Sequence, residues 1–241
     1  ALSSIPVYGA IPHLNSRKNI QSFQEALRVV RTNLEFLQGS QKSKILTITS
    51  SIPSEGKTTV STELANIIAK SHKKVVLLDL DMRRARIHEK YKLANNIGVS
   101  TLLAGNNTLD EVLQTTQIEN LDVLTAGPVP PNPSELLLTD TFKEIINVLL
   151  ERYDYIIFDS PPVGLVTDAM ILMKLSDINL FVFKANYSKK DFIKNINRFV
   201  EEQELSSCGT ILNGVEMGKK FGYGYGYGYG YGYAHNYYNS K

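Results

Sequence analysis

The chain has 241 residues, enough for one large α/β domain and few for two. Its composition, 43% apolar and 21% charged, is typical of a soluble globular protein, and a net charge of +2 is too small to indicate nucleic acid or anionic lipid as the main partner. The single Cys208 excludes an internal disulfide and a four-cysteine metal site. No apolar run approaches the roughly 18 residues of a membrane-spanning helix. Because initiator Met and signal peptide are both absent, we expect a fragment of a longer protein.

The first 38 residues divide into two parts. Residues 1–19 contain Pro6, Gly9 and Pro12 and show no periodicity, which predicts an irregular entry arm. Residues 20–38 place apolar side chains at steps of three or four, which predicts an amphipathic helix ending near Gly39.

From residue 45 onward, short β-rich runs alternate with helical segments. Several of these runs are apolar throughout, as expected for strands covered on both faces, so the alternation predicts a doubly wound, mostly parallel α/β sheet flanked by helices. We assign residues 20–218 to this domain, and Ser188 is the expected N-cap of its last helix. The predicted strands are Ile45–Ser50, Lys74–Leu78, Leu121–Thr125, Tyr155–Asp159, Ile178–Lys184 and Thr210–Asn213, and the predicted helices are 57–71, 134–151, 167–175 and 188–204.

The C-terminus has a different composition. The segment "GYGYGYGYGYGYAHNYYNSK" runs from Gly222 to Lys241, and the last 19 residues hold eight of the 13 tyrosines. Glycine at every second position leaves little to pack, so residues 219–241 are predicted to form a mobile, low-complexity tail.

A phosphate-binding loop follows the first strand of the domain. The pattern G-x-x-x-x-G-K-[ST] reads Ser51-Ile-Pro-Ser-Glu-Gly56-Lys57-Thr58, with serine in place of the first glycine. Gly56 would let the backbone approach phosphate, Lys57 would reach the β- and γ-phosphates, and Thr58 would offer a hydroxyl to Mg²⁺. A plain strand–turn–helix connection is the alternative interpretation.

Acidic residues end two of the predicted strands. "VVLLDLDMRR" carries Asp79 and Asp81, followed by Arg83, and "YDYIIFDSPP" carries Asp159. Ligands of open α/β sheets bind beyond the carboxyl ends of the strands, where carboxylates can hold Mg²⁺ or accept a proton from an attacking hydroxyl. Together with the loop, these residues predict ATP or GTP with Mg²⁺ as the ligand. Asn213 could hydrogen-bond a purine edge, or it could be an ordinary Asn-Gly turn signal.

Four motifs in combination resemble those of the bacterial tyrosine kinases (BY-kinases): "SSIPSEGKTT", "LLDLDMRR", "GPVPPNPSELL" and "YIIFDSPP". The resemblance extends from about Ile5 to the C-terminus and implies a P-loop NTPase fold with Walker A, A′ and B motifs. It is strongest to the cytoplasmic domain of the membrane-bound proteobacterial form that controls exopolysaccharide or capsule export, which implies a location on the cytoplasmic side of the inner membrane and a juxtamembrane entry arm at residues 1–19.

The resemblance implies roles for individual residues. Lys57, Asp79, Asp81 and Asp159 would be catalytic, with Asp79 orienting or deprotonating the tyrosine hydroxyl. Mg²⁺ would be held by Thr58, Asp81 and Asp159. The residues expected to bind ATP are Ser54, Glu55, Gly56, Lys57, Thr58, Thr59, Arg83 and Asn213.

In this family the tyrosine-rich C-terminus is the autophosphorylation substrate. The expected sites here are Tyr223, Tyr225, Tyr227, Tyr229, Tyr231, Tyr233, Tyr237 and Tyr238. The strict Gly-Tyr repeat departs from the looser tyrosine cluster of the family, which leaves open which of them are modified. Expected partners are the protein's own transmembrane and periplasmic region and a cognate tyrosine phosphatase.

The helix at residues 20–38 contains "EALRVVR", which matches the E-x-x-R-x-x-R oligomerisation motif of the family. Glu25, Arg28 and Arg31 share one helix face, which without the resemblance would be interpreted as solvated. The resemblance implies a homo-oligomeric ring of about eight subunits, an octamer, in which each subunit offers its tail to the next active site.

Two other classes remain as alternatives. ParA/MinD-type ATPases share the Walker A′ arrangement, but they carry a signature lysine at the position of Ile52 and have no tyrosine tail. A non-catalytic scaffold with an adhesive tail would not need intact Lys57, Asp79, Asp81 and Asp159.

Overall fold

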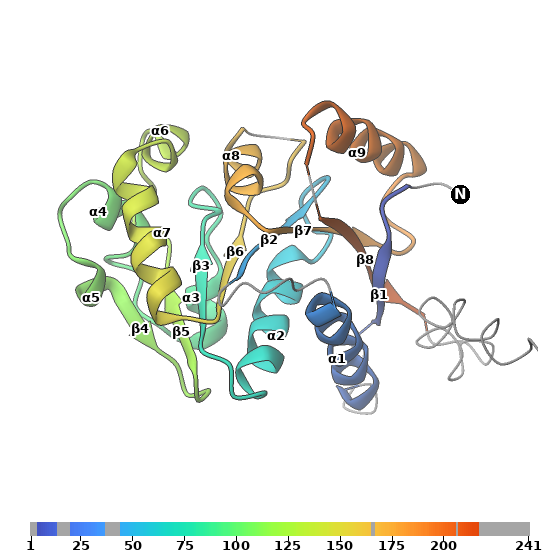
Figure 1. Ribbon diagram of the computed structural model, residues 1–241, viewed down its shortest axis with the longest axis horizontal. Coiled ribbons are helices and arrows are strands. Elements are labelled where there is room, and N and C mark those ends of the chain that lie inside the picture. Colours follow the sequence, from blue (N-terminus) through green and yellow to red (C-terminus); the bar gives the residue numbers. More distant parts are fainter. Residues whose placement is uncertain (1–3, 14–19, 37–43, 165–166, 206, 217–241) are drawn as a thin grey trace, which may run out of the picture.

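The computed structural model describes residues 4–13, 20–36, 44–164, 167–205 and 207–216. Within these residues, eight strands form one sheet in the order β1-β8-β7-β2-β6-β3-β5-β4 (Figure 1). Neighbouring strands are parallel except for β4, which pairs antiparallel with β5. The strands are β1 (Val7–Pro12), β2 (Lys44–Ser50), β3 (Val75–Asp79), β4 (Leu113–Thr115), β5 (Leu121–Leu124), β6 (Tyr155–Asp159), β7 (Ile178–Lys184) and β8 (Cys208–Val215).

Helices cover both faces of the sheet (Figure 1). They are α1 (Ile20–Phe36), α2 (Lys57–Ala69), α3 (Ile87–Tyr91), α4 (Val99–Leu103), α5 (Leu109–Val112), α6 (Pro133–Leu137), α7 (Asp140–Arg152), α8 (Asp168–Leu175) and α9 (Lys190–Glu202).

Alternate residues of the central strands pack into different cores. Leu77 and Ile157 join α1 and α2 in one cluster, whereas Leu78 and Phe158 join α7 and α8 in another. Because side chains of a strand point alternately to opposite faces, apolar residues at every position bury both faces of the sheet. The predicted doubly wound, mostly parallel sheet is confirmed.

The first strand corrects the prediction of an irregular entry arm. β1 lies at the edge of the sheet and pairs parallel with β8, with Val7 opposite Thr210. Proline is tolerated in an edge strand because one side of that strand makes no ladder hydrogen bonds. Gly9 is required by close packing, since a Cβ there would lie 2.4 Å from Val30 Cγ2 of α1.

Two predicted helices also differ from the structure. The segment predicted as one helix over 134–151 is two helices, because Thr139 has an extended backbone and caps α7 by accepting from the Phe142 amide. The last helix begins at Lys190 with Lys189 as its N-cap, so Ser188 is not the cap. The Ser188 hydroxyl is engaged elsewhere, as described below.

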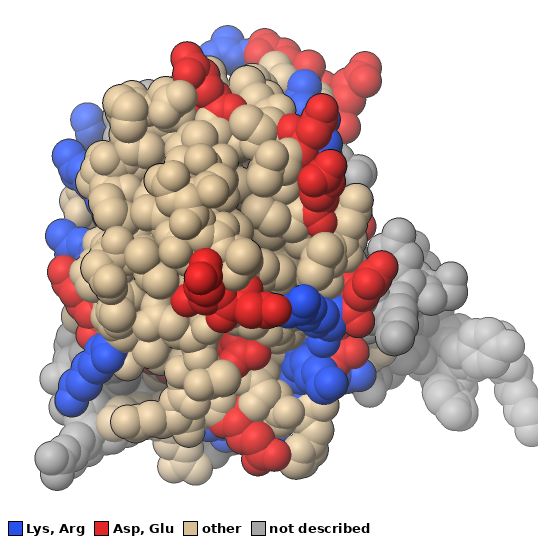
Figure 2. Space-filling view, turned by 90° about the vertical axis from the view of Figure 1, so that its left-hand side faces the viewer, with Lys and Arg blue, Asp and Glu red and all other residues tan. Residues whose placement is uncertain are grey.

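The end of the molecule that carries β4 and α7 faces the viewer in Figure 2. Acidic and basic side chains are interspersed on this face among a larger area of uncharged residues. Among the described residues, no helix is both long enough and apolar enough to cross a membrane.

Candidate active site

The phosphate-binding loop connects β2 to α2 at the carboxyl edge of the sheet. Ser54 and Gly56 have φ angles of 69° and 99°, in the left-handed region. A Cβ on residue 56 would lie 2.1 Å from Asn213 Nδ2, so only glycine fits there without displacing Asn213. α2 begins directly at Lys57, and its first amide groups therefore face the space where phosphate would bind.

Glu55 holds this loop from the inside. Its side chain is fully buried, and the carboxylate accepts hydrogen bonds from the amides of Ser51 and Ile52 at 2.7 and 3.0 Å and from the Ser51 hydroxyl at 2.9 Å. The Ser188 hydroxyl also donates to Glu55. We expected Glu55 to bind ATP, but any contact from this residue to a nucleotide would have to come from its backbone. Ser51, which replaces the first glycine of the motif, is the feature of the sequence that could have indicated these hydrogen bonds, because its hydroxyl is one of the donors to Glu55.

The structure brings the predicted acidic residues together at the ends of β3 and β6. Asp79 and Asp159 are paired residues of these adjacent strands. Lys57 Nζ lies 2.8 Å from Asp81 Oδ2 and 3.8 Å from Asp159 Oδ1. Thr58 donates its hydroxyl to Asp159 Oδ2 at 2.7 Å. The Walker A residues are therefore in direct contact with one carboxylate of each acidic motif.

Burial and mutual charge shift the protonation of this group. Burial lowers the pKa of Lys57, but Asp159 and Asp81 outweigh that effect, so the pKa of Lys57 lies above its ordinary value. Burial raises the pKa of Asp159, although Lys57 and the Thr58 hydroxyl oppose the shift. Lys57 is therefore a protonated cation that faces carboxylates from the wall of a largely buried site.

Asp79 is the least satisfied member of the group. It is fully buried, and its Oδ2 accepts from the amides of Arg86 and Ile87 at 3.0 Å each. Its Oδ1 is buried and has no hydrogen-bond partner among the described residues. Burial and, as the second largest cause, repulsion from Asp159 raise the pKa of Asp79 to about 7. A carboxyl group with a pKa near neutrality can accept and release a proton at physiological pH.

The donor set fits a magnesium ion that is bound together with a nucleotide. Mg²⁺ is usually held by one or two protein oxygens, several waters and the phosphates, not by an all-protein cage. The described residues contain no cluster of three metal-binding side chains of the His, Cys, Asp or Glu type. Thr58, Asp81 and Asp159 would supply hard oxygen ligands, and the unpartnered Asp79 Oδ1 is a further acceptor nearby.

A cavity of about 720 Å³ lies over the loop. Its wall carries six basic and two acidic side chains, an excess of positive charge that suits a polyphosphate. The predicted ATP-binding residues that line it are Ser54, Gly56, Lys57, Thr58, Thr59, Arg83 and Asn213. Glu55, Asp79 and Asp159 do not line it.

Asn213 lies within β8, which continues to Val215, so the residue does not end the strand in a turn. Its side-chain amide donates to the Glu55 carbonyl at 3.0 Å while the residue also lines the cavity. The amide therefore fixes the phosphate-binding loop, and its contact with a purine stays a prediction.

The predicted oligomerisation residues lie on α1. Glu25 and Arg28 are exposed and form an ion pair at 2.8 Å within the helix, and Arg31 Nε lies 3.5 Å from Glu35 Oε1. Phe23, Leu27, Val30 and Leu34 form the buried side of this helix. The eight predicted phosphorylation sites, from Tyr223 to Tyr238, lie outside the described residues.

Comparison with known proteins places this geometry in a family. A family described as "AAA domain" matches residues 43–207. Tyrosine-protein kinase YwqD of Bacillus subtilis is 35% identical over 201 residues, which cover 83% of this chain and 85% of YwqD. The chain belongs to the bacterial tyrosine kinases. Tyrosine-protein kinase etk of Escherichia coli is 36% identical over 85% of this chain, but the match spans only 28% of etk.

Solved structures agree with this membership. The kinase domain of Escherichia coli ETK aligns over 92% of this chain and 95% of its own length, with 34% identity and a TM-score of 0.82. The septum site-determining protein MinD of Pyrococcus horikoshii shares the fold with 27% identity and a TM-score of 0.60, over 71% of this chain. The chain is therefore a tyrosine kinase built on the P-loop fold that MinD-type ATPases also use.

Proposed function

We propose that this kinase transfers the γ-phosphate of ATP to the tyrosines of its own C-terminal tail, with the tail of one subunit entering the active site of a neighbour. The observation that carries the proposal is the group formed by Lys57, Asp81 and Asp159 beside the buried Asp79. This group combines a cation for the phosphates with a carboxyl group able to manage the proton of a phenol.

The reaction is a single transfer of a phosphoryl group from ATP to a tyrosine oxygen. The phenolic oxygen forms a bond to the γ-phosphorus, the bond from that phosphorus to the β,γ-bridging oxygen breaks, and ADP leaves with the bond electrons. Because an unperturbed phenol has a pKa of about 10, it needs a base or a precise position to react at neutral pH. Asp79 would orient the phenol or take its proton. Because its side chain is buried and does not line the cavity in this structure, that role requires the bound substrates to open a path to Oδ1.

The remaining residues stabilise charge. Lys57 leaves its ion pair with Asp81 to bind the phosphates, and the loop amides and the start of α2 add partial positive charge. When bound, Mg²⁺ supplies positive charge that neutralises the phosphate oxygens, and Thr58, Asp81 and Asp159 would hold it. The basic side chains of the cavity, among them Arg83, complete the charge balance.

The tail would supply the acceptors. Of the other five tyrosines, Tyr8, Tyr91, Tyr153 and Tyr155 are wholly or largely buried. Tyr187 is 47% exposed, although its hydroxyl lies 3.3 Å from the Pro53 carbonyl of the loop. A tethered, glycine-rich tail would present its phenols at an effective concentration in the millimolar range.

The wider setting is part of the same proposal. Glu25, Arg28 and Arg31 would contact the neighbouring subunit in a ring of about eight subunits. The kinase would act at the cytoplasmic face of the bacterial inner membrane together with its transmembrane and periplasmic region, and would regulate exopolysaccharide or capsule polymerisation and export. A cognate phosphatase would reverse the modification. The support is the match to the kinases CapB of Staphylococcus aureus and etk of Escherichia coli.

One experiment tests the transfer. The full chain is incubated with Mg-ATP, and phosphate is mapped by mass spectrometry. We expect phosphotyrosine within Tyr223–Tyr238, with Tyr187 as an exposed internal control that stays unmodified, and we expect no transfer in the Lys57→Met variant. Release of inorganic phosphate without protein modification would overturn the proposal and favour a MinD-type switch. Mixing a Lys57→Met chain with an active chain that lacks tail tyrosines tests transfer between subunits, because only the inactive chain then carries acceptors.

A further inference from the structure

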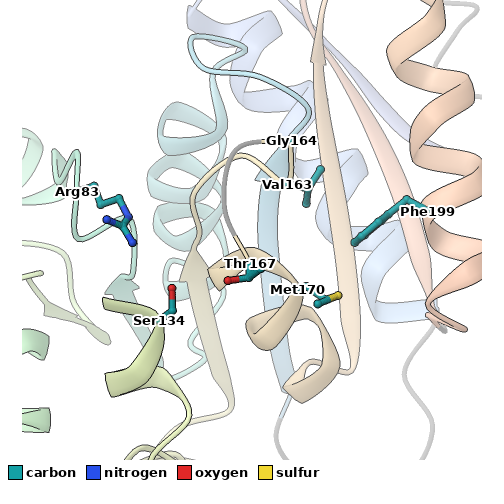
Figure 3. Close-up of a pocket in the computed structure, with 7 residues that line it drawn as sticks. All are labelled: Arg83, Ser134, Val163, Gly164, Thr167, Met170 and Phe199. Atoms are coloured by element: carbon teal, nitrogen blue, oxygen red, sulfur yellow. The ribbon is translucent and has the colours of Figure 1, made fainter. Parts of the chain in front are cut away.

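A second cavity, of about 500 Å³, adjoins the nucleotide cavity. Figure 3 shows polar side chains of Arg83, Ser134 and Thr167 in one part of its lining and the apolar side chains of Val163, Met170 and Phe199 in the other. None of these residues other than Arg83 lines the nucleotide cavity. The cavity therefore has its own chemistry, with a polar region and an apolar region.

The polar part is fixed by a buried carboxylate. Asp168 is 2% exposed, accepts a hydrogen bond from the Ser134 hydroxyl, and lies 3.8 Å from Arg83 Nε. Asp168 is the first residue of α8 and Ser134 belongs to α6, so two helices and the segment after β3 are tied together at this point. A hydroxyl and a guanidinium held in this way can bind a hydroxyl or an anion.

Two separate contacts show that the second cavity lies next to the place of phosphoryl transfer. Arg83 lines both cavities and follows Asp81 by two residues, so their Cα atoms are at most about 7.6 Å apart. On the other side, the Val163 amide donates to the Ser50 carbonyl at 2.9 Å, directly before the phosphate-binding loop. An occupant of this cavity would therefore be a close neighbour of the reacting group.

We infer that this cavity binds a second tyrosine of the Gly-Tyr tail while a neighbouring tyrosine of the same tail reacts. The inference rests on the proposed function. Tyrosine combines an apolar ring with a polar hydroxyl, which matches the two parts of the lining. The ring would pack against Met170, Val163 and Phe199, and the hydroxyl would face Arg83 and Ser134.

The strict repeat of the tail supports this occupant. In an extended chain, residues two apart point to the same face and are about 6.6–6.8 Å apart, so every phenol of the Gly-Tyr repeat shares one face. The two subsites lie beside each other, since Arg83 lines both cavities and Asp81 lines the nucleotide cavity. Because the spacing is constant along Tyr223–Tyr233, docking any one tyrosine brings the next to the phosphate, whichever register the tail adopts.

The tail also begins near this edge. Asn213 and Gly214 line the nucleotide cavity, and the described chain continues only to Glu216. β8 and β6 are separated by β7 and β2 in the sheet, which is about 14 Å at the usual strand spacing. The six residues from 217 to 222 can span about 20 Å, so the chain length allows the repeat to reach this edge.

Two acceptor peptides test the inference. Each peptide has one tyrosine between two glycines. In Phe-Gly-Tyr-Gly-Phe the outer residues are phenylalanine, and in Ala-Gly-Tyr-Gly-Ala they are alanine. The enzyme is the full-length chain with all eight tail tyrosines replaced by alanine, so that its own tail does not compete. We expect KM for the phenylalanine peptide to be lower by about fivefold or more, with kcat little changed.

The Met170→Gln variant makes the test specific. It should abolish the preference for the phenylalanine peptide and leave turnover of the alanine peptide unchanged, which also shows that the variant is folded. Lys174→Gln, on the same helix but outside the cavity, should keep the preference. Equal KM values for the two peptides, or a preference that survives in Met170→Gln, would overturn the inference while leaving the kinase proposal intact. If neither peptide is phosphorylated, the inference is overturned, whereas the kinase proposal is decided separately by the mapping of phosphate on the intact tail.

Discussion

Replacing Asp79 by asparagine should make the nucleotide-free protein more stable at alkaline pH. The side chain is fully buried, and Oδ2 caps the amides of Arg86 and Ile87 while Oδ1 has no partner among the described residues. An asparagine carbonyl can accept the same two hydrogen bonds without a charge. The substitution therefore removes a buried charge and keeps the cap.

The magnitude follows from the pKa of about 7 in the folded protein. In the unfolded chain an aspartate has a pKa of about 3.9, so the shift is about 3 units, or about 4 kcal/mol at 1.36 kcal/mol per unit. Between these two pKa values the folded protein binds the proton more tightly than the unfolded chain, so its stability falls as pH rises through that window and is lowest above pH 7. Since burying the amide also has a cost, we expect a gain of about 2–4 kcal/mol for Asp79→Asn at pH 8.

The assay is urea unfolding followed by far-ultraviolet circular dichroism, from pH 5 to pH 8.5, without nucleotide or Mg²⁺. The gain should shrink steadily toward pH 5, where the wild-type carboxyl group is largely protonated. Asp81→Asn is the matched control, because its carboxylate pairs with Lys57 at 2.8 Å and its loss should lower stability. Asp79→Asn should also lose tyrosine phosphorylation, which separates stability from catalysis at one residue.

A gain that is independent of pH would refute this reasoning, because it would come from packing and not from charge. The absence of any gain at pH 8 would refute it as well, since the carboxylate would then be solvated or paired. The difference between the variant and wild type is the quantity to compare, because Asp159 also has a raised pKa and contributes to both curves.

Three further predictions concern the loop and the oligomer. Glu55→Gln should lower the free energy of unfolding by about 2 kcal/mol and weaken ATP binding about tenfold, because an NH₂ group would then face backbone donors of the loop. Urea unfolding measures the first effect and nucleotide titration the second. Asn213→Ala should weaken ATP and GTP equally if the amide only fixes the Glu55 carbonyl, and unequally if it binds the purine edge, as competition titration will show. Arg28→Ala combined with Arg31→Ala should reduce the mass measured by light scattering to that of a monomer if these residues join subunits.

The Glu55 prediction has a matched control, and contrary outcomes can be stated for Glu55→Gln and for the double arginine variant. Glu202→Gln changes an exposed partner of Arg198 on α9, outside the nucleotide cavity, and should leave the affinity for ATP within about twofold, since surface ion pairs contribute little. Unchanged ATP affinity in Glu55→Gln would mean that the buried network does not set the shape of the loop. An unchanged mass for the double arginine variant would mean that α1 does not form the subunit contact.

Local sequence patterns were sufficient for the general fold and for most of the site. The six predicted strands are all present, because each is a short run of apolar residues that must be covered on both faces. Lys57, Thr58, Asp81 and Asp159 meet at the predicted edge, because parallel strands end there together. The strands and the site residues are each recognised from a short stretch of sequence, by its composition and by the spacing of its residues.

The tertiary structure alone decided contacts between distant segments. β1 was missed because an edge strand is stabilised by its partner, β8, about 200 residues later, and Pro6, Gly9 and Pro12 hide it locally. Ser188 has the composition of a helix cap but donates to Glu55, 133 residues away. Hydrogen bonds between residues so far apart in the sequence cannot be predicted from local periodicity, since they depend on which loops the folded sheet places together.

The chemistry of Asp79 shows the same division. Its position after an apolar strand follows from the sequence, and so does its proximity to a phosphate-binding loop. Its raised pKa does not, because that value is set by complete burial and by Asp159 from the neighbouring strand. The sequence thus determined which groups are present at the site, and the packing of β3 against β6 determined which of them can carry a proton near neutral pH.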